Sequence, residues 1–137
     1  MLHPDIRREM LEDEVAVAEE RLGGRIAALS STADDVSCRF VSPNGRTYHL
    51  RFDARWYDAE PLRLSVVDEQ GKALPASEWP PGLCHSQHPV LGVPFACVRG
   101  TYEYHAHPSH LPDRWDRYRS RIRLADLLDH LLRKCGR

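Results

Sequence analysis

The sequence has almost no net charge and no long apolar stretch, and these two absences exclude several classes of protein. The formal charge is −1 over 137 residues, so the chain lacks the overall positive charge that would attract it to nucleic acids and anionic membranes. No apolar stretch approaches the length of a membrane span, and segment 1–20 lacks the apolar core of a secretory signal. We therefore expect a cytoplasmic protein that binds neither nucleic acid nor membrane.

The cysteines lack the spacing of a disulfide or zinc framework. There are four of them, Cys38, Cys84, Cys97 and Cys135, and none forms the C-x-x-C pair that is common in structural zinc sites. Nothing in the sequence directs the chain to an oxidising compartment, where an even number of cysteines would form disulfides. We expect all four to be free thiols.

The composition is that of one folded domain. Hydrophobic residues make up 42% and charged residues 28% of the chain, which are ordinary fractions for a globular protein. A length of 137 residues suits one domain with its own core. Because we find no internal repeat and no second domain, we predict a single domain over 1–137.

The first half of the sequence predicts a helix followed by an antiparallel sheet. We expect the helix over 4–22, because Pro4 suits the first helical turn and Gly23 and Gly24 can end it. Apolar residues then alternate with polar ones, and Pro43-Asn44-Gly45 predicts a tight turn between two strands. Four strands are expected, over 25–31, 36–42, 46–53 and 62–68. This order indicates the α+β class.

The second half is dominated by a long segment rich in proline and histidine. Seven prolines between 73 and 113 prevent long helices and central strands. Within this segment we expect regular structure only at 93–98, as a short extended piece. Such a segment in a small domain is usually functional or disordered, and its aromatic residues argue against disorder. A last helix is expected over 121–134, with Ser120 as its N-cap and Gly136 after its end.

Cys97 in the long segment could be a nucleophile. It follows the apolar stretch 93–96 and precedes a polar loop, where Arg99 or a histidine could favour the thiolate. Free cysteines are also commonly buried as small apolar residues. The residues alone leave both interpretations open.

Histidines of the same segment could hold a metal ion. His105, His107 and His110 lie within one short loop, and zinc is the natural ion for such ligands. A fourth ligand could come from Cys84, His85, His88 or Cys97. Histidine-rich loops without metal are common as well, and Pro108 interrupts this one, so a zinc site is an alternative hypothesis.

Five arginines between 114 and 123 form the one strongly basic stretch. Together with Trp115 and Tyr118 they could contact the phosphates and bases of a nucleic acid. Asp113, Asp116 and Asp126 offset this charge, and the chain as a whole is nearly neutral. A solvated surface is the better interpretation.

The order of these features resembles that of the ubiquitin-conjugating enzyme family. That family also has a helix, a four-stranded meander, a long segment with a His-Pro pair and a later cysteine, a tryptophan and a helix. His88-Pro89 resembles the start of the family's His-Pro-Asn motif, and Cys97 follows at about the family's distance, roughly one residue short. The resemblance covers nearly the whole chain.

Two further stretches support the resemblance. Segment 115–132 is similar to the family's Trp-Ser-Pro-Ala-x-Thr-Ile stretch and the helix that follows, with Ser120 at the Thr position and Ile122 at the Ile position. Segment 56–62, Trp-Tyr-Asp-Ala-Glu-Pro-Leu, is similar to the family's Tyr-Pro-x-x-Pro-Pro turn before the fourth strand.

This resemblance implies a ubiquitin-conjugating-like fold and an acyl-transfer activity that requires no cofactor. Cys97 would accept the C-terminus of a ubiquitin-like protein from an activating enzyme as a thioester and would pass it to an amine. His88 and His105 would complete the catalytic residues, and the substrate would contact Pro89, Tyr104 and Trp115. The divergence of the motifs and the arginine-rich composition suit a bacterial member of the family.

The sequence departs from the family beside the cysteine. Val90 stands where the family has its Asn, and Asn44 is the only Asn in the chain. The missing donor to the tetrahedral oxyanion could be replaced by His85, Gln87, Tyr104 or His105. The departure keeps a second interpretation open, namely an inactive member of the fold that only binds a ubiquitin-like protein or another partner.

Overall fold

The computed structural model describes residues 1–135 and begins with the predicted helix. Helix α1 spans Pro4–Leu22, and the side chain of His3 accepts a hydrogen bond from the Asp5 N–H at its start. One face of α1 is buried, and the chain leaves it at Gly23 through a short 3-10 turn, Gly23–Arg25. No helix within these residues is long and apolar enough to cross a membrane.

Four strands form one antiparallel sheet in chain order, as predicted. They are β1 Ala28–Ser31, β2 Asp35–Val41, β3 Thr47–Asp53 and β4 Arg63–Val67. In β2 and β3 the buried positions alternate with more exposed ones, so one face of the sheet lines the core. Strand β1 is shorter than expected, because the 3-10 turn takes up the first of the residues predicted for it.

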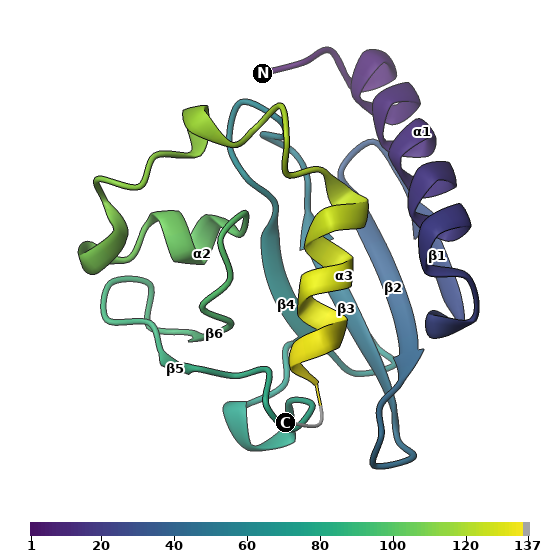
Figure 1. Cartoon of the computed structure of the whole chain (residues 1–137), viewed down its shortest axis with the longest axis vertical. Helices are drawn as coiled ribbons and strands as arrows, with labels where there is room; N and C mark the ends of the chain where they lie inside the picture. Colours follow the sequence, from purple (N-terminus) through teal and green to yellow (C-terminus); the bar gives the residue numbers. More distant parts are fainter. Residues whose placement is uncertain (136–137) are drawn as a thin grey trace.

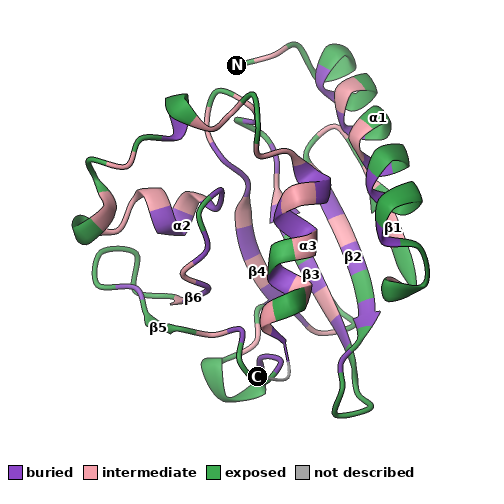
Figure 2. Cartoon of the chain, in the orientation of Figure 1, coloured by how far each residue is buried: buried purple, intermediate pink, exposed green. Residues whose placement is uncertain are grey.

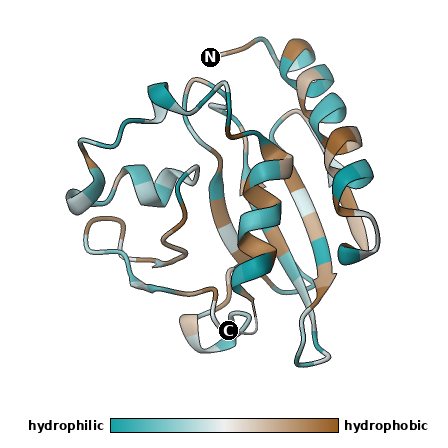
Figure 3. Ribbon diagram, viewed as in Figure 1, coloured by the Kyte–Doolittle hydropathy of each residue, from teal (hydrophilic) through white to brown (hydrophobic). Residues whose placement is uncertain are grey.

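The second long helix, α3, spans Leu124–Lys134 and covers one face of the sheet, while α1 lies towards the β1 side (Figure 1). Buried residues of α1 face the interior, and buried positions recur along α3 and β2 (Figure 2). Apolar and polar residues alternate along α3, whose buried face carries most of its leucines (Figure 3). Two helices on a four-stranded antiparallel sheet confirm the α+β class.

Helix α3 begins at Leu124, so the expected start at residue 121 and the expected cap Ser120 are both wrong. Arg123 is the N-cap, and its backbone N–H donates to Asp126 Oδ2 at 2.9 Å. The Leu124 N–H donates to Glu14 Oε1 of α1 at 3.0 Å. A carboxylate from a distant helix therefore satisfies a terminal N–H group. Gly136, the expected stop, lies outside the described residues.

Glu14 is part of a network that joins both helices to the loop after β3. Its Oε2 accepts a hydrogen bond from Arg123 at 2.6 Å, and its Oε1 accepts one from the Tyr57 hydroxyl at 2.9 Å. Arg123 also donates to Asp58 Oδ2 at 2.7 Å, and the Asp58 carbonyl accepts from the Trp115 indole at 2.9 Å. This network sets where α3 begins and how the chain approaches it.

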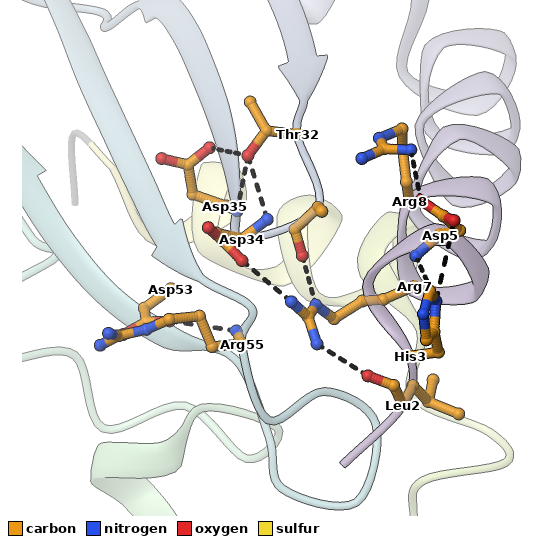
Figure 4. A network of polar contacts seen from close by, with 11 residues as sticks. Leu2, His3, Asp5, Arg7, Arg8, Thr32, Asp34, Asp35, Asp53 and Arg55 are labelled. Carbon is orange, nitrogen blue, oxygen red and sulfur yellow. Dashed lines mark hydrogen bonds and ion pairs between the residues drawn. The ribbon is translucent and has the colours of Figure 1, made fainter.

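A second network holds the start of α1 against the turn between β1 and β2 (Figure 4). The buried guanidinium of Arg7 donates to the carbonyl oxygens of Ala33 and Leu2 and to Asp34 Oδ1. A buried arginine is tolerated only when its donors are satisfied in this way.

The proline- and histidine-rich segment contains several short elements and lies on the β4 side of the sheet (Figure 1). They are the 3-10 turn Ala76–Glu78, strands β5 Ser86–Gln87 and β6 Pro94–Phe95, helix α2 Tyr102–His105, and the 3-10 turn Pro108–His110; a further 3-10 turn, Trp115–Arg117, follows the segment. Strand β6 falls within the predicted extended piece 93–98. The Tyr102 N–H donates to the Leu62 carbonyl at 2.9 Å, which attaches α2 to the start of β4.

Candidate active site around Cys97

Cys97 lies between β6 and α2, and its side chain is half-buried. Its neighbours Ala96 and Val98 are buried and fix the backbone on both sides. Its Sγ lies 3.6 Å from Nε2 of His110, in the 3-10 turn Pro108–His110. A partly exposed thiol beside an imidazole is the arrangement that a nucleophilic cysteine needs.

The other three cysteines lie in surroundings that favour the neutral thiol. Burial raises the pKa of Cys38 to about 12 and that of Cys135 to about 11. Cys84 is half-buried, its pKa is also raised by burial, and its Sγ contacts the Ser86 carbonyl at 3.9 Å. Cys97 is therefore the best nucleophile candidate of the four.

An aromatic stack positions His110 beside the sulfur. Its ring lies parallel to that of Tyr104, with centroids 4.1 Å apart and planes inclined by 12°. The Tyr104 hydroxyl donates to Asp113 Oδ2 at 2.6 Å, and the Tyr118 hydroxyl donates to Asp113 Oδ1 at 2.5 Å. These hydrogen bonds, with help from Arg99, hold the pKa of Asp113 well below its usual range. An ionised Asp113 thus fixes the tyrosine on which His110 stacks.

His105, a predicted catalytic and metal-binding residue, uses both of its ring nitrogens in the loop. Its Nε2 accepts a hydrogen bond from the Gly100 N–H at 3.1 Å, so the proton resides on Nδ1, which donates to the Asp113 carbonyl at 2.7 Å. Burial lowers the pKa of His105, which favours this neutral form. Without rearrangement, His105 has no free nitrogen for proton transfer or for a metal ion.

Gly100 is needed for this arrangement. Its φ is +105°, a conformation that favours glycine, and a Cβ there would lie 2.8 Å from Cγ2 of Ile122. The close approach of the loop to Ile122 places the Gly100 N–H beside the His105 ring.

His88, the other predicted catalytic histidine, is 1% exposed and shapes the turn that follows it. Its Nδ1 accepts hydrogen bonds from the N–H groups of Val90 and Leu91 at 3.1 and 3.0 Å. Its Nε2 therefore carries the proton and donates to the Glu103 carbonyl at 2.8 Å. His88 acts on the backbone beside the site and has no nitrogen left for a substrate.

The predicted metal ligands do not converge on one point. No group of three or more histidine, cysteine, aspartate or glutamate side chains within residues 1–135 could hold a metal ion. His107 packs against Phe95, and its Nδ1 accepts a hydrogen bond from the Ser109 N–H at 3.1 Å. A zinc site formed by Cys84, His105, His107 and His110 stays a prediction, and it would require His105 to give up the hydrogen bond on the nitrogen that binds the metal.

The three predicted substrate contacts differ in exposure. Pro89 is exposed, on the turn that His88 shapes. Tyr104 is almost fully buried, and both its ring face and its hydroxyl are occupied. Trp115 is 7% exposed and its indole N–H donates to the Asp58 carbonyl, so its ring belongs to the core. Of the three, Pro89 is best placed to meet a partner.

The four residues considered as replacements for the missing Asn also differ. Gln87 donates from Nε2 to the Gly92 carbonyl at 3.2 Å, and the donors of Tyr104 and His105 are occupied as described above. His85 is exposed and contacts Phe95. The histidine that lies beside the sulfur is His110, which the sequence suggested only as a metal ligand. His110 lies thirteen positions after Cys97, and no sequence motif marks the pair.

No protein-family model matches this chain, and no curated protein sequence matches it.

Proposed function

We propose that the protein is a ubiquitin-conjugating-like carrier of a bacterial conjugation pathway in the cytoplasm. It would accept the C-terminus of a ubiquitin-like protein from an activating enzyme as a thioester on Cys97 and pass it to an amine. The observation that carries the proposal is the half-buried Cys97 sulfur, 3.6 Å from His110 Nε2. The order of helix, four-stranded meander, active-site segment and helix, shared with ubiquitin-conjugating enzymes, supports the fold assignment.

His110 would act as the general base in both the loading and the transfer step. During loading it takes the thiol proton while the sulfur attacks the incoming thioester, a new C–S bond forms and the activating enzyme's thiolate leaves. During transfer a neutral amine attacks the carbonyl carbon, a C–N bond forms, the C–S bond breaks, and the Cys97 sulfur leaves with its electron pair. His110 takes the surplus proton of the amine and can pass it to the departing sulfur. Asp113 and Tyr104 would keep the imidazole in place without touching the substrate.

Loading by the partner proteins tests the proposal directly. The protein is incubated with an activating enzyme, a ubiquitin-like protein and ATP, and intact mass is measured with and without thiol reductant. We expect a reducible adduct that Cys97→Ala abolishes and Cys84→Ala retains. An adduct that persists in Cys97→Ala would reject Cys97 as the acceptor and assign the thioester to Cys84.

The role of His110 has a matched control in the same loop. His110→Ala should slow the loading of Cys97 by about 10²-fold or more, the usual contribution of a positioned general base. His107→Ala removes a half-buried imidazole that stacks on Phe95 and lies 5.4 Å from the His110 ring, but that does not contact the sulfur, and it should leave loading within about twofold of the wild type. Equal rates for the two variants would reject His110 as the base.

Two other functions make different predictions for the same protein. An inactive binding protein of this fold would have a Cys97 that a mild alkylating agent modifies only on unfolding. A zinc-binding protein would retain metal after purification without an affinity tag. Rapid alkylation of native Cys97 in a metal-free preparation would reject both alternatives.

A further inference from the structure

The last residue of α3 reaches the backbone of Cys97. Lys134 is half-buried, and its Nζ donates a hydrogen bond to the Cys97 carbonyl oxygen at 3.4 Å. The chain has only two lysines, and the other, Lys72, is exposed in the turn after β4. One of the two lysine amines therefore lies at the site proposed to carry the thioester.

The Lys134 amine is within reach of an acyl group on the sulfur. Covalent geometry keeps the sulfur of a cysteine within about 5 Å of its own carbonyl oxygen, so Nζ lies within roughly 8 Å of the Cys97 Sγ. The thioester carbonyl carbon is bonded directly to that sulfur. The flexible four-carbon stem of lysine can cover the remaining distance, because this long hydrogen bond is a weak restraint.

No carboxylate competes for Lys134 among the described residues. The ion pairs within 1–135 are formed by arginines, apart from one that involves His3. Asp113, the carboxylate bonded to Tyr104, is already occupied by Arg99 and two tyrosine hydroxyls. No ion pair among the described residues therefore holds the Lys134 amine away from Cys97.

We propose that Lys134 is an acceptor for the acyl group carried on Cys97, so that the loaded protein modifies itself at Lys134. This inference rests on the function proposed above. The neutral amine attacks the thioester carbonyl, the C–N bond forms, the C–S bond breaks, and the electron pair leaves with the Cys97 sulfur. The surplus proton of the amine passes to the thiolate or to His110. The product is an amide on Lys134 and a free Cys97.

A small thioester tests this step without any partner protein. The protein is incubated with the 2-mercaptoethanesulfonate thioester of N-acetylglycine at pH 8, which can exchange its acetylglycyl group onto Cys97. Neutral hydroxylamine then removes a thioester and leaves an amide, and peptide mass spectrometry locates what remains. We expect a thioester on Cys97 that converts with time into a hydroxylamine-resistant adduct on Lys134.

Two lysine variants make the test specific. Lys134→Arg keeps a donor for the Cys97 carbonyl, so the fold should be retained while the Cys97 thioester accumulates and amide formation falls at least tenfold. Lys72→Arg removes the other lysine and should leave the conversion unchanged. Unfolding curves of both variants verify that neither has lost its structure.

The outcomes separate this inference from the function on which it rests. A stable Cys97 thioester that never yields an amide on Lys134 would overturn the inference and leave the carrier function standing. An amide on Lys134 that forms equally fast in Cys97→Ala would also overturn it, because the reagent would then act on the amine directly. Failure of Cys97 to form any thioester would count against the carrier function itself.

Discussion

Glu103 should make the attachment of α2 to the sheet depend on pH. Its side chain is 5% exposed, and its Oε1 accepts a hydrogen bond from the Leu64 N–H of β4 at 2.8 Å. Burial raises its pKa from the ordinary 4.5 to about 7. The Glu103 carbonyl accepts the hydrogen bond from His88 Nε2, and the next residue, Tyr104, stacks on His110.

The sign and size of the effect follow from these two pKa values. Between pH 4.5 and 7 the folded protein binds a proton at Glu103 that the unfolded chain has released, so stability falls as the pH rises. The stabilising contribution is complete below about pH 4.5 and is lost above about pH 7. A pKa difference of this size corresponds to about 3 kcal/mol. Glu103→Gln keeps an acceptor for Leu64 but cannot ionise, so it should remove this dependence.

Urea unfolding at pH 5 and pH 8 measures the effect. We expect Glu103→Gln to be within about 1 kcal/mol of the wild type at pH 5 and about 2–3 kcal/mol more stable at pH 8. Taking the difference between the two proteins cancels the other groups that titrate over this range. A gap between the two proteins that is the same at both pH values would refute the reasoning, because burial would then not have raised this pKa.

Two further substitutions test the packing of the fold. Glu14→Ala should lower the free energy of unfolding, measured in urea, by about 2–4 kcal/mol, because Arg123 loses a partner and the Leu124 N–H loses its acceptor. The loss should lie near the lower end of the range for a buried ion pair, because the side chains of Glu14 and Arg123 are 12% and 28% exposed. His49→Val should instead raise the free energy of unfolding by about 1 kcal/mol, because both ring nitrogens of His49 are buried and have no hydrogen-bond partner among residues 1–135. A loss of stability in His49→Val would show that this imidazole has a partner that stabilises the sheet.

The elements that sequence patterns predicted are those whose causes are local. Helix α1 has its starting proline and its ending glycine within its own sequence. The hairpin between β2 and β3 forms because Gly45 has a φ of +83° and the Asn44 side chain accepts from the Arg46 N–H. The alternation of apolar and polar residues then indicates which face of each strand is buried. These patterns can be read without knowing the contacts of distant residues.

The start of α3 could not be predicted in this way. Ser120 had the right chemistry for a cap, but the N–H of Leu124 is satisfied by Glu14, a residue 110 positions earlier in the chain. The short elements between 76 and 117 have the same kind of cause. Helix α2, for example, is joined to β4 through Tyr102 and Glu103, and neither contact is visible in its own four residues.

Only part of the candidate site could be predicted from the sequence, because only some of its residues are marked by local patterns. Cys97 could be chosen from its position after an apolar stretch, which is a local property. Its neighbour His110 could not, because a 3-10 turn and the stack on Tyr104 bring it to the sulfur. His105 had a stronger sequence argument, as part of a closely spaced histidine pair, but its nitrogens are used by Gly100 and Asp113.

The histidines of the segment differ in whether their ring nitrogens are used in hydrogen bonds to the backbone. A neutral imidazole offers one donor and one acceptor. His88 and His105 each use both on backbone groups, which holds a proline-rich chain in place where no regular strand or helix can form. His110 is positioned by stacking of its ring on Tyr104, so its Nε2 can contact the Cys97 sulfur. A histidine that is positioned by stacking can still exchange a proton, and for that reason His110 is the catalytic candidate of this segment.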